Sequence, residues 1–179
     1  KDNAGNTKQG TVSKGTGTVE QPATATCTPT TWTNGKVTVT LPTKTGFTTR
    51  YTTDGTKPTT SSTAYSAPFT VSGNCTITFV YSDETNVSPT SQTANITNID
   101  TIAPNNFTPT ATSTTKSITV TASATDADAT STSGKSGIAG YRFKLDNGSW
   151  TNYQTSGSYT WNNLSQTTDH TITVETKDN

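Results

Sequence analysis

Charge is scarce in this chain, and the two signs cancel. Only 13% of the 179 residues are charged, and 12 basic residues balance 12 acidic ones. A chain without excess charge creates no long-range field that attracts nucleic acid or an anionic membrane surface. Neither is therefore expected as a partner. Histidine occurs once, at His170, and no Cys/His pattern with zinc-ligand spacing is present.

Hydrophobic residues are also few, at 27%. No apolar run approaches the roughly 18–20 residues that a transmembrane helix needs, so no membrane span is predicted. Disordered chains combine low hydrophobicity with high net charge and few aromatics, whereas aromatic residues are spread along this chain. Roughly a quarter of the residues are Thr, a β-branched type that suits strands, and no segment of ten residues has helical periodicity. The sequence therefore predicts an all-β protein of thin sandwiches.

Only two cysteines occur, Cys27 and Cys75, and both lie in the first half of the chain. In a Thr-rich chain without helices we expect an extracellular protein and one disulfide between these residues. A loop of this length closed by a disulfide would stabilise the fold by about 4 kcal/mol in the chain-entropy model. The alternative is a pair of buried free thiols in strands.

The length suits two domains. We expect residues 1–21 to hold a closing strand of a preceding repeat and a linker, residues 22–99 to form a first sandwich, residues 100–104 to form a short semi-rigid linker, and residues 105–179 to form a second sandwich. Strand signals in the first sandwich come at short, even spacing. They cover residues 24–30, 36–41, 47–53, 65–71, 75–81 and 91–99.

The second sandwich has fewer strand signals. Apolar residues alternate on one face of residues 118–124 and again over residues 141–145, which lead into the turn Asp146-Asn147-Gly148. Ile172 and Val174 mark a last strand. Between them, residues 126–137 are predicted to form a polar loop.

The last residues of the chain are similar to its first residues. It opens Lys-Asp-Asn-Ala-Gly-Asn-Thr-Lys and closes Thr-Lys-Asp-Asn. A fixed long period is the mark of a repeat array, so the chain is expected to be one period of a tandem array in which the period boundary falls inside a domain.

Residues 51–59, Tyr-Thr-Thr-Asp-Gly-Thr-Lys-Pro-Thr, with Tyr65 and Pro68 after them, resemble the chitobiase/β-hexosaminidase C-terminal-type domain. That family carries a Tyr-Thr-Thr-Asp-Gly-Ser/Thr-x-Pro-Thr turn and is an immunoglobulin-like (Ig-like) sandwich of bacterial extracellular proteins. The resemblance covers about residues 22–99. The cysteine pair is not part of the family pattern.

The second half resembles bacterial Ig-like repeats that end in Asp-x-Ala-Gly-Asn. The matching positions are Tyr141, Phe143, Leu145, Asp146, Gly148, Leu164, His170, Ile172, Val174 and Asp178. The Ala-Gly-Asn stands instead at residues 4–6, after Asp2 and Asn3. The resemblance thus implies two Ig-like β-sandwich modules in tandem, the second without its last strand. Residues 4–14 look like that strand from a preceding copy, and the assembly residues are Ala4, Gly5, Asn6, Thr7 and Val12.

An open sheet edge is a template for another strand. We therefore expect unpaired backbone groups beside residues 141–145 or 172–174, completed by residues 4–14 of a neighbouring copy through β-strand addition. The identical neighbours then follow one another head to tail, either covalently continuous or as separate subunits.

Three further features of the sequence are candidate sites. Asp100, Asp126 and Asp128 are weak calcium candidates, because Ca²⁺ prefers oxygen ligands from flexible loops; a solvated loop is the alternative. Trp150, Tyr153 and Trp161, with Tyr159 near them, could stack on sugar rings, or could close a thin core. His170 lies near Ser158, Ser165 and Asp169 in sequence, but the resemblance places it in a structural turn, so no catalytic residues and no cofactor are expected.

The predicted function is a structural repeat of an extracellular bacterial surface protein, such as a stalk, adhesin or filament. Neither family implies an enzyme. Glycans or a host surface are candidate ligands. The alternatives are carbohydrate-binding accessory domains of a secreted glycoside hydrolase, or decorative Ig-like domains of a phage tail or capsid.

Overall fold

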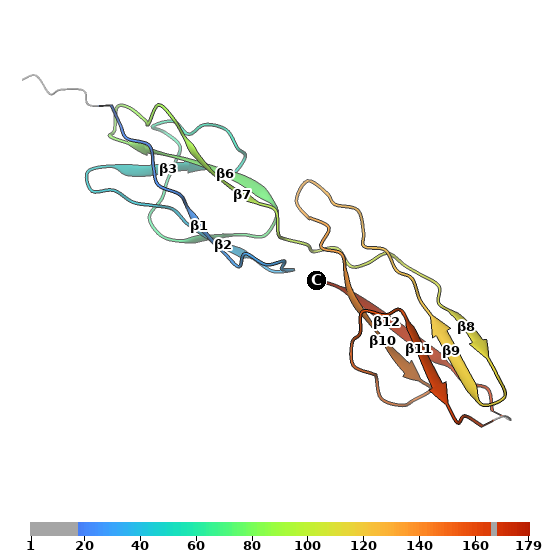
Figure 1. Ribbon diagram of the computed structural model, residues 1–179. Coiled ribbons are helices and arrows are strands. Elements are labelled where there is room, and N and C mark those ends of the chain that lie inside the picture. The colour runs from blue at the N-terminus through green and yellow to red at the C-terminus, as the bar shows by residue number, and fades with distance from the viewer. Residues whose placement is uncertain (1–17, 166–167) are drawn as a thin grey trace, which may run out of the picture.

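The computed structural model describes residues 18–165 and 168–179. Two β-sandwich domains lie end to end and give the molecule an elongated shape (Figure 1). The described residues contain strands and no helix, which confirms the all-β prediction, and none of them forms a helix that could cross a membrane.

The first domain packs a three-stranded sheet against a four-stranded sheet, with strand orders β1-β2-β5 and β4-β3-β6-β7. All pairings between its strands are antiparallel. Its core holds Val37 and Val39 from one sheet and Ile77 and Phe79 from the other, all with 0% exposure. The strands are β1 (Thr26–Thr28), β2 (Val37–Thr40), β3 (Thr48–Thr52), β4 (Thr63–Ala64), β5 (Phe69–Val71), β6 (Cys75–Ser82) and β7 (Gln92–Ile96).

The described part of the second domain has five strands, in sheets of order β11-β9-β8 and β10-β12. Phe143 at its centre is fully buried, and Val120, Ala122 and Tyr141 surround it. The strands are β8 (Thr110–Ser113), β9 (Ser117–Thr121), β10 (Ile138–Leu145), β11 (Ser158–Asn162) and β12 (Ile172–Asp178).

Strand β6 differs from the alternating pattern expected of it. Thr78 and Val80 are almost as fully buried as Ile77 and Phe79, so both faces of β6, a central strand between β3 and β7, are covered. Cys75, expected to point inward with them, is only half-buried at the start of the strand.

The expected disulfide is absent. Cys27 on β1 and Cys75 on β6 are both free thiols, half-buried against the same core. Burial raises the pKa of both, and for Cys75 the neighbouring Cys27 adds to the increase. The two thiols therefore behave as small core side chains.

The segment before the first domain also differs from expectation. Val19 is 5% exposed, and the Ser88 hydroxyl donates a hydrogen bond of 2.6 Å to the Glu20 carbonyl oxygen. Glu20 also pairs with Lys44. Residues 18–20 thus pack on the first domain, where a linker was predicted, because Val19 finds apolar cover there.

Candidate functional site at the domain junction and the β12 edge

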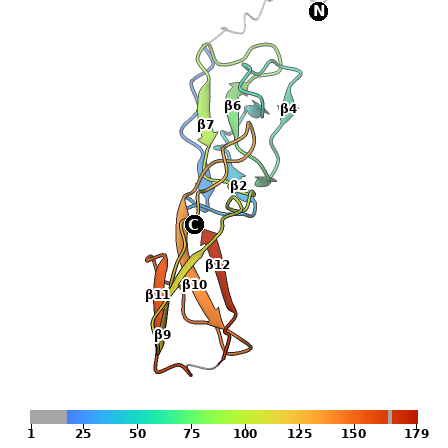
Figure 2. The same ribbon diagram turned by 90° about the vertical axis from the view of Figure 1, so that its right-hand side faces the viewer.

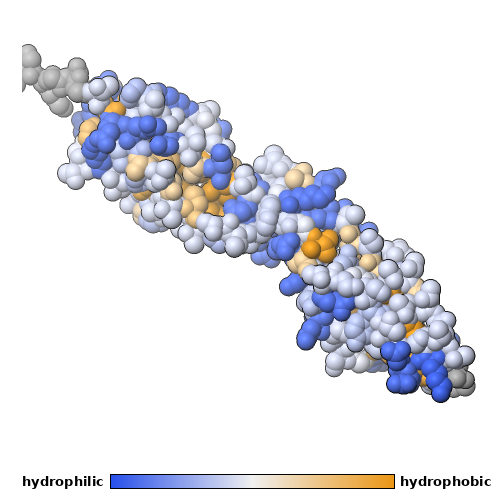
Figure 3. Space-filling view, in the orientation of Figure 1, coloured by the Kyte–Doolittle hydropathy of each residue, from blue (hydrophilic) through white to orange (hydrophobic). Residues whose placement is uncertain are grey.

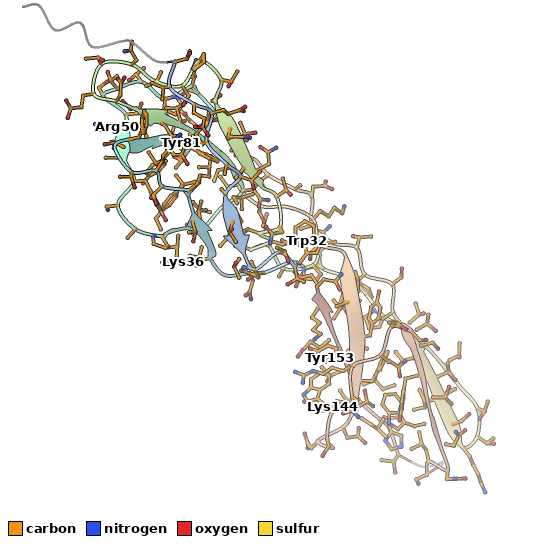
Figure 4. The ribbon with its side chains drawn as sticks, turned by 60° about the vertical axis from the view of Figure 1, so that its left-hand side comes forward. Trp32, Lys36, Arg50, Tyr81, Lys144 and Tyr153 are labelled. Carbon is orange, nitrogen blue, oxygen red and sulfur yellow. The ribbon has the colours of Figure 1, made fainter. Side chains whose placement is uncertain are left out.

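Residues 126–137, here named the junction loop, leave the second domain and contact the first. The Asn74 N–H donates to the Thr132 carbonyl oxygen, and the Gly134 N–H donates to the Ile99 carbonyl oxygen, both at 2.7 Å. Trp32, which Figure 4 places at the junction, lies directly against Gly134: a Cβ atom on this glycine would come within 2.5 Å of the indole ring. The loop therefore connects the two domains through backbone hydrogen bonds.

Three carboxylates meet beside this loop, here named the acidic cluster. They are Asp100 from the interdomain segment, Asp126 from the start of the junction loop, and Asp178 from the end of β12. One oxygen from each lies within 4.8 Å of the others. Asp100 and Asp126 are only 3% and 4% exposed. The interdomain segment, the junction loop and the end of β12 thus bring together three carboxyl groups, two of them buried and that of Asp178 half-buried.

Backbone and hydroxyl donors hold Asp100 in place. Its Oδ1 accepts from the Ile102 N–H at 3.2 Å and the Ser133 hydroxyl at 3.3 Å, and its Oδ2 accepts from the Ser136 N–H at 2.9 Å. Burial alone would raise the pKa of Asp100, but the hydrogen bonds from these three residues outweigh it and lower that pKa. Asp100 is therefore kept as a carboxylate.

The other two members are less well satisfied. Asp126 accepts a hydrogen bond at Oδ2 from the Gly137 N–H, while its Oδ1 is buried with no hydrogen-bond partner. Burial raises the pKa of Asp178, and the negative charges of Asp100 and Asp126 add to that increase. Among the described residues, no Lys, Arg or His forms an ion pair with the cluster.

The structure thus changes the predicted set of acidic residues. Asp100 and Asp126 do come together, but Asp128 points away, with a side chain that is 98% exposed and paired with Lys135 at 3.2 Å. Asp178 takes its place, 52 positions beyond Asp126 in the chain. Its only signal in the sequence was its position in the Asp-x-Ala-Gly-Asn pattern, which says nothing of distance to the loop.

The second feature is an open sheet edge on β12. Strand β10 lies between two neighbours: Tyr141 and Phe143 exchange hydrogen bonds with Gln154 and Thr151 on one side, and β12 pairs along the other. The β10 edge is thus occupied, and of the two edges expected to be open only that of β12 lacks a partner within residues 18–165 and 168–179.

The register of this pair identifies the unpaired groups. The backbone N–H and C=O groups of Tyr141 and Phe143 point towards residues 151–154. Those of the alternate residues of β10 therefore point towards β12, where they bond the paired residues Thr173 and Glu175. The N–H and C=O groups of Ile172, Val174 and Thr176 therefore point away from β10. Within the described residues no strand pairs with them.

Two hollows lie along this edge, here named the edge groove. One, of about 350 Å³, lies between β8, β9 and the start of β12, with Pro109, Ile118, Val120 and Ile172 in its wall. The other, of about 310 Å³, separates residues 103–107 and Pro109 from Val174–Thr176. The sandwich is thus open on the side where β12 has no partner, and apolar side chains that are half-buried or, for Val120, buried line the opening.

The aromatic candidates divide into two groups. Trp161 and Tyr159 pack edge to face, with ring centroids 4.8 Å apart, against the second core. Trp150 and Tyr153 instead lie on the outer face of β10 and β12, where Arg142 stacks on both rings, at 4.6 and 5.0 Å from their centroids. Figure 4 shows Tyr153 and Lys144 on the same side of the domain.

Charged partners hold this outer face together. The Arg142 guanidinium lies 2.8 Å from the Glu175 carboxylate, to which the Tyr153 hydroxyl also donates. The hydrogen bonds from Arg142 and Tyr153 lower the pKa of Glu175. Trp150 and Tyr153 are thus part of a local network in which cations already cover the rings.

His170 contacts the carboxylate of Asp146. Its Nδ1 lies 2.8 Å from Asp146 Oδ2, and the Thr171 N–H donates to the other oxygen at 2.7 Å. These contacts join the turn after β10 to the start of β12. His170 thus lies just before β12, bonded to the turn that follows β10. The assembly residues Ala4, Gly5, Asn6, Thr7 and Val12 lie outside the described residues.

Two antiparallel sheets face each other in each domain, and the chain is an all-β protein of Ig-like sandwich type. Residues 28–93 match the family model described as Chitobiase/beta-hexosaminidase C-terminal domain, so the first domain is of this type. A comparison with curated proteins finds no match to the chain.

Proposed function

We propose that this protein is a structural repeat of an extracellular bacterial surface protein, and that its copies assemble head to tail by strand complementation. The open edge of β12 beside the edge groove is the observation that carries the proposal. The occupant is residues 4–14 of a neighbouring copy, which hold the Ala-Gly-Asn turn and one apolar residue, Val12.

The direction of β12 supports this arrangement. The strand runs towards the junction, and the C-terminus lies between the two domains in both views (Figures 1 and 2). A strand that turns back after Asn179 would run antiparallel to β12 and leave at the far end of the second domain. The first domain of the next copy would then follow in line, as an extended stalk requires.

The chemistry of the edge supports the same occupant. The outward N–H and C=O groups of Ile172, Val174 and Thr176 would form a ladder with the added strand, while alternate side chains of that strand enter the groove. A polar strand with one apolar residue fits a groove whose walls are only partly apolar. Such a contact is head to tail, does not close on itself, and builds a filament.

Sedimentation of the full chain at increasing concentration tests the proposal. Wild-type protein should form species that grow with concentration, and Val12→Asp should stay monomeric because a carboxylate cannot enter the groove without a partner. Ser13→Asp is the matched control, since adjacent residues of a strand point to opposite faces. A wild-type chain that stays monomeric, or equal assembly of both variants, would contradict the proposal.

A second candidate function is a carbohydrate-binding accessory domain of a glycoside hydrolase. The family match of residues 28–93 favours it, as do two exposed aromatics, Trp32 at 38% and Tyr153 at 37% exposure. Co-sedimentation with insoluble chitin tests it. Retention of the wild type, lost in both Trp32→Ala and Tyr153→Ala, would support this function, and no retention would exclude chitin as the ligand.

A further inference from the structure

The acidic cluster holds carboxyl groups whose negative charge no neighbouring cationic side chain among the described residues balances. Asp100 and Asp126 are both more than nine-tenths buried, and Asp178 lies beside them. A buried carboxylate without a partner is strongly disfavoured and normally acquires a proton, a cationic side chain or a metal ion. The described Lys and Arg residues do not supply the cation, since the ion pairs that they form are elsewhere.

One oxygen points to a missing ligand independently of the charge count. Asp126 Oδ1 is buried and has no hydrogen-bond partner, although the other oxygen of the same carboxylate accepts from the Gly137 N–H. Buried polar atoms in native proteins almost always have a partner. The unpaired oxygen belongs to one of the three carboxyl groups of the acidic cluster, so it is available to a ligand of that group.

The spacing fits a calcium ion. Ca²⁺ takes oxygen ligands at about 2.3–2.6 Å, so two ligands on opposite sides of one ion lie about 5 Å apart. The three carboxylate oxygens of the cluster lie within 4.8 Å of one another. Mg²⁺ demands a tighter octahedron and retains several waters, which a cluster with two almost fully buried carboxylates does not favour.

We propose that Asp100, Asp126 and Asp178 bind one Ca²⁺ ion at the domain junction. The ion would join the interdomain segment, the junction loop and the end of β12. Because Thr132 and Gly134 of that loop bond the first domain, the ion would also stiffen the joint between the domains. This site does not depend on strand addition at the β12 edge.

Calorimetric titration of the chelator-treated full chain with CaCl₂ tests the proposal. The wild type should bind one equivalent, with a dissociation constant in the range of about 10⁻⁴–10⁻³ M that is typical of extracellular calcium modules. Saturating CaCl₂ should also raise the melting temperature, because a ligand that binds only the folded state stabilises it. Titration with MgCl₂ should give a weaker response.

Two substitutions in one loop give a matched comparison. Asp126→Asn should abolish both the saturable heat and the shift in melting temperature, while Asp128→Asn, two residues away and exposed, should keep both. If Asp126→Asn does not fold by circular dichroism, Asp178→Asn at the end of β12 replaces it. No calcium response in the wild type, an equal response to MgCl₂, or an unchanged response in the cluster variants would overturn the proposal.

Discussion

At the scale of single residues, Gly157 shows how closely the second domain is packed. Its carbonyl oxygen accepts from the Ala122 N–H at 2.8 Å, and a Cβ atom on this glycine would lie 2.1 Å from the Ala122 carbonyl oxygen. Because the obstacle is backbone, a rotamer change cannot relieve it. Only glycine fits here.

Gly157→Ala should therefore destabilise the second domain by about 1–3 kcal/mol, the usual cost of overpacking. Urea denaturation followed by circular dichroism measures this change. Gly35→Ala is the control, because a Cβ atom there makes only an ordinary contact of 3.4 Å with Thr33 Oγ1 and should change the free energy of unfolding by less than about 0.5 kcal/mol. Equal effects of both substitutions would contradict the packing described.

The Asp146–His170 contact predicts a pH dependence. The hydrogen bond from His170, followed by that from the Thr171 N–H, lowers the pKa of Asp146 below its ordinary value. A carboxyl group whose pKa is lower in the folded state stabilises the fold above its unfolded pKa of about 4. That stabilisation is lost as the pH falls through the folded pKa.

Asp146→Asn should accordingly be less stable than the wild type at neutral pH, and the gap should close as the pH falls below about 4. Asn tolerates the positive φ of 48° at this position, so the substitution tests mainly the charge. Chemical denaturation at a series of pH values measures the gap. A gap that stays constant down to the acid limit would show that the carboxylate charge is not the cause.

At the scale of elements, the sequence predicts strands well where side chains alternate. The sequences of β2, β9 and β10 show alternating apolar residues, because one face of each strand contacts a core. Strand β8 has no such signal: all four of its residues are exposed, and it forms only because its backbone pairs with β9. Backbone pairing of that kind leaves no mark on residue type.

The acidic cluster shows the same limit for a site. Local composition identified Asp126 and Asp128 together, because they are two residues apart in a polar loop. Only the fold separates them, as Asp128 turns to solvent and Asp178 arrives from the end of β12. Which carboxylates meet depends on strand order and direction, which a single sequence does not contain.

The two cysteines offer a test at this scale, because they lie on strands of opposite sheets. Burial raises the pKa of both thiols, and the thiolate is the reactive form, so alkylation of the native protein at neutral pH should be slow. Unfolding should release two reactive thiols, counted by mass spectrometry. Two labels that form only after a reducing agent is added would show that the disulfide exists and that the free-thiol state is wrong.

At the scale of the whole molecule, the joint between the domains and the β12 edge lie next to each other. The surface is largely polar along the elongated body (Figure 3), and the joint is bridged by hydrogen bonds of the junction loop. The β12 edge ends at that same joint. A strand added there would continue the sheet of β10 and β12 beside the acidic cluster, to which Asp178 at the end of β12 belongs.

Amide hydrogen exchange on a rearranged chain tests this account most directly. Residues 4–14 are moved behind Asn179, so that the strand can fold back on β12 of its own chain, and the parent chain is compared at a concentration where it is monomeric. The amides of Val174 and Thr176, which face away from β10, should become protected, while those of Thr173 and Glu175 are protected in both chains. The same rearranged chain with Val12→Asp should lose the gain. Unchanged exchange at Val174 and Thr176 would contradict strand complementation at the β12 edge.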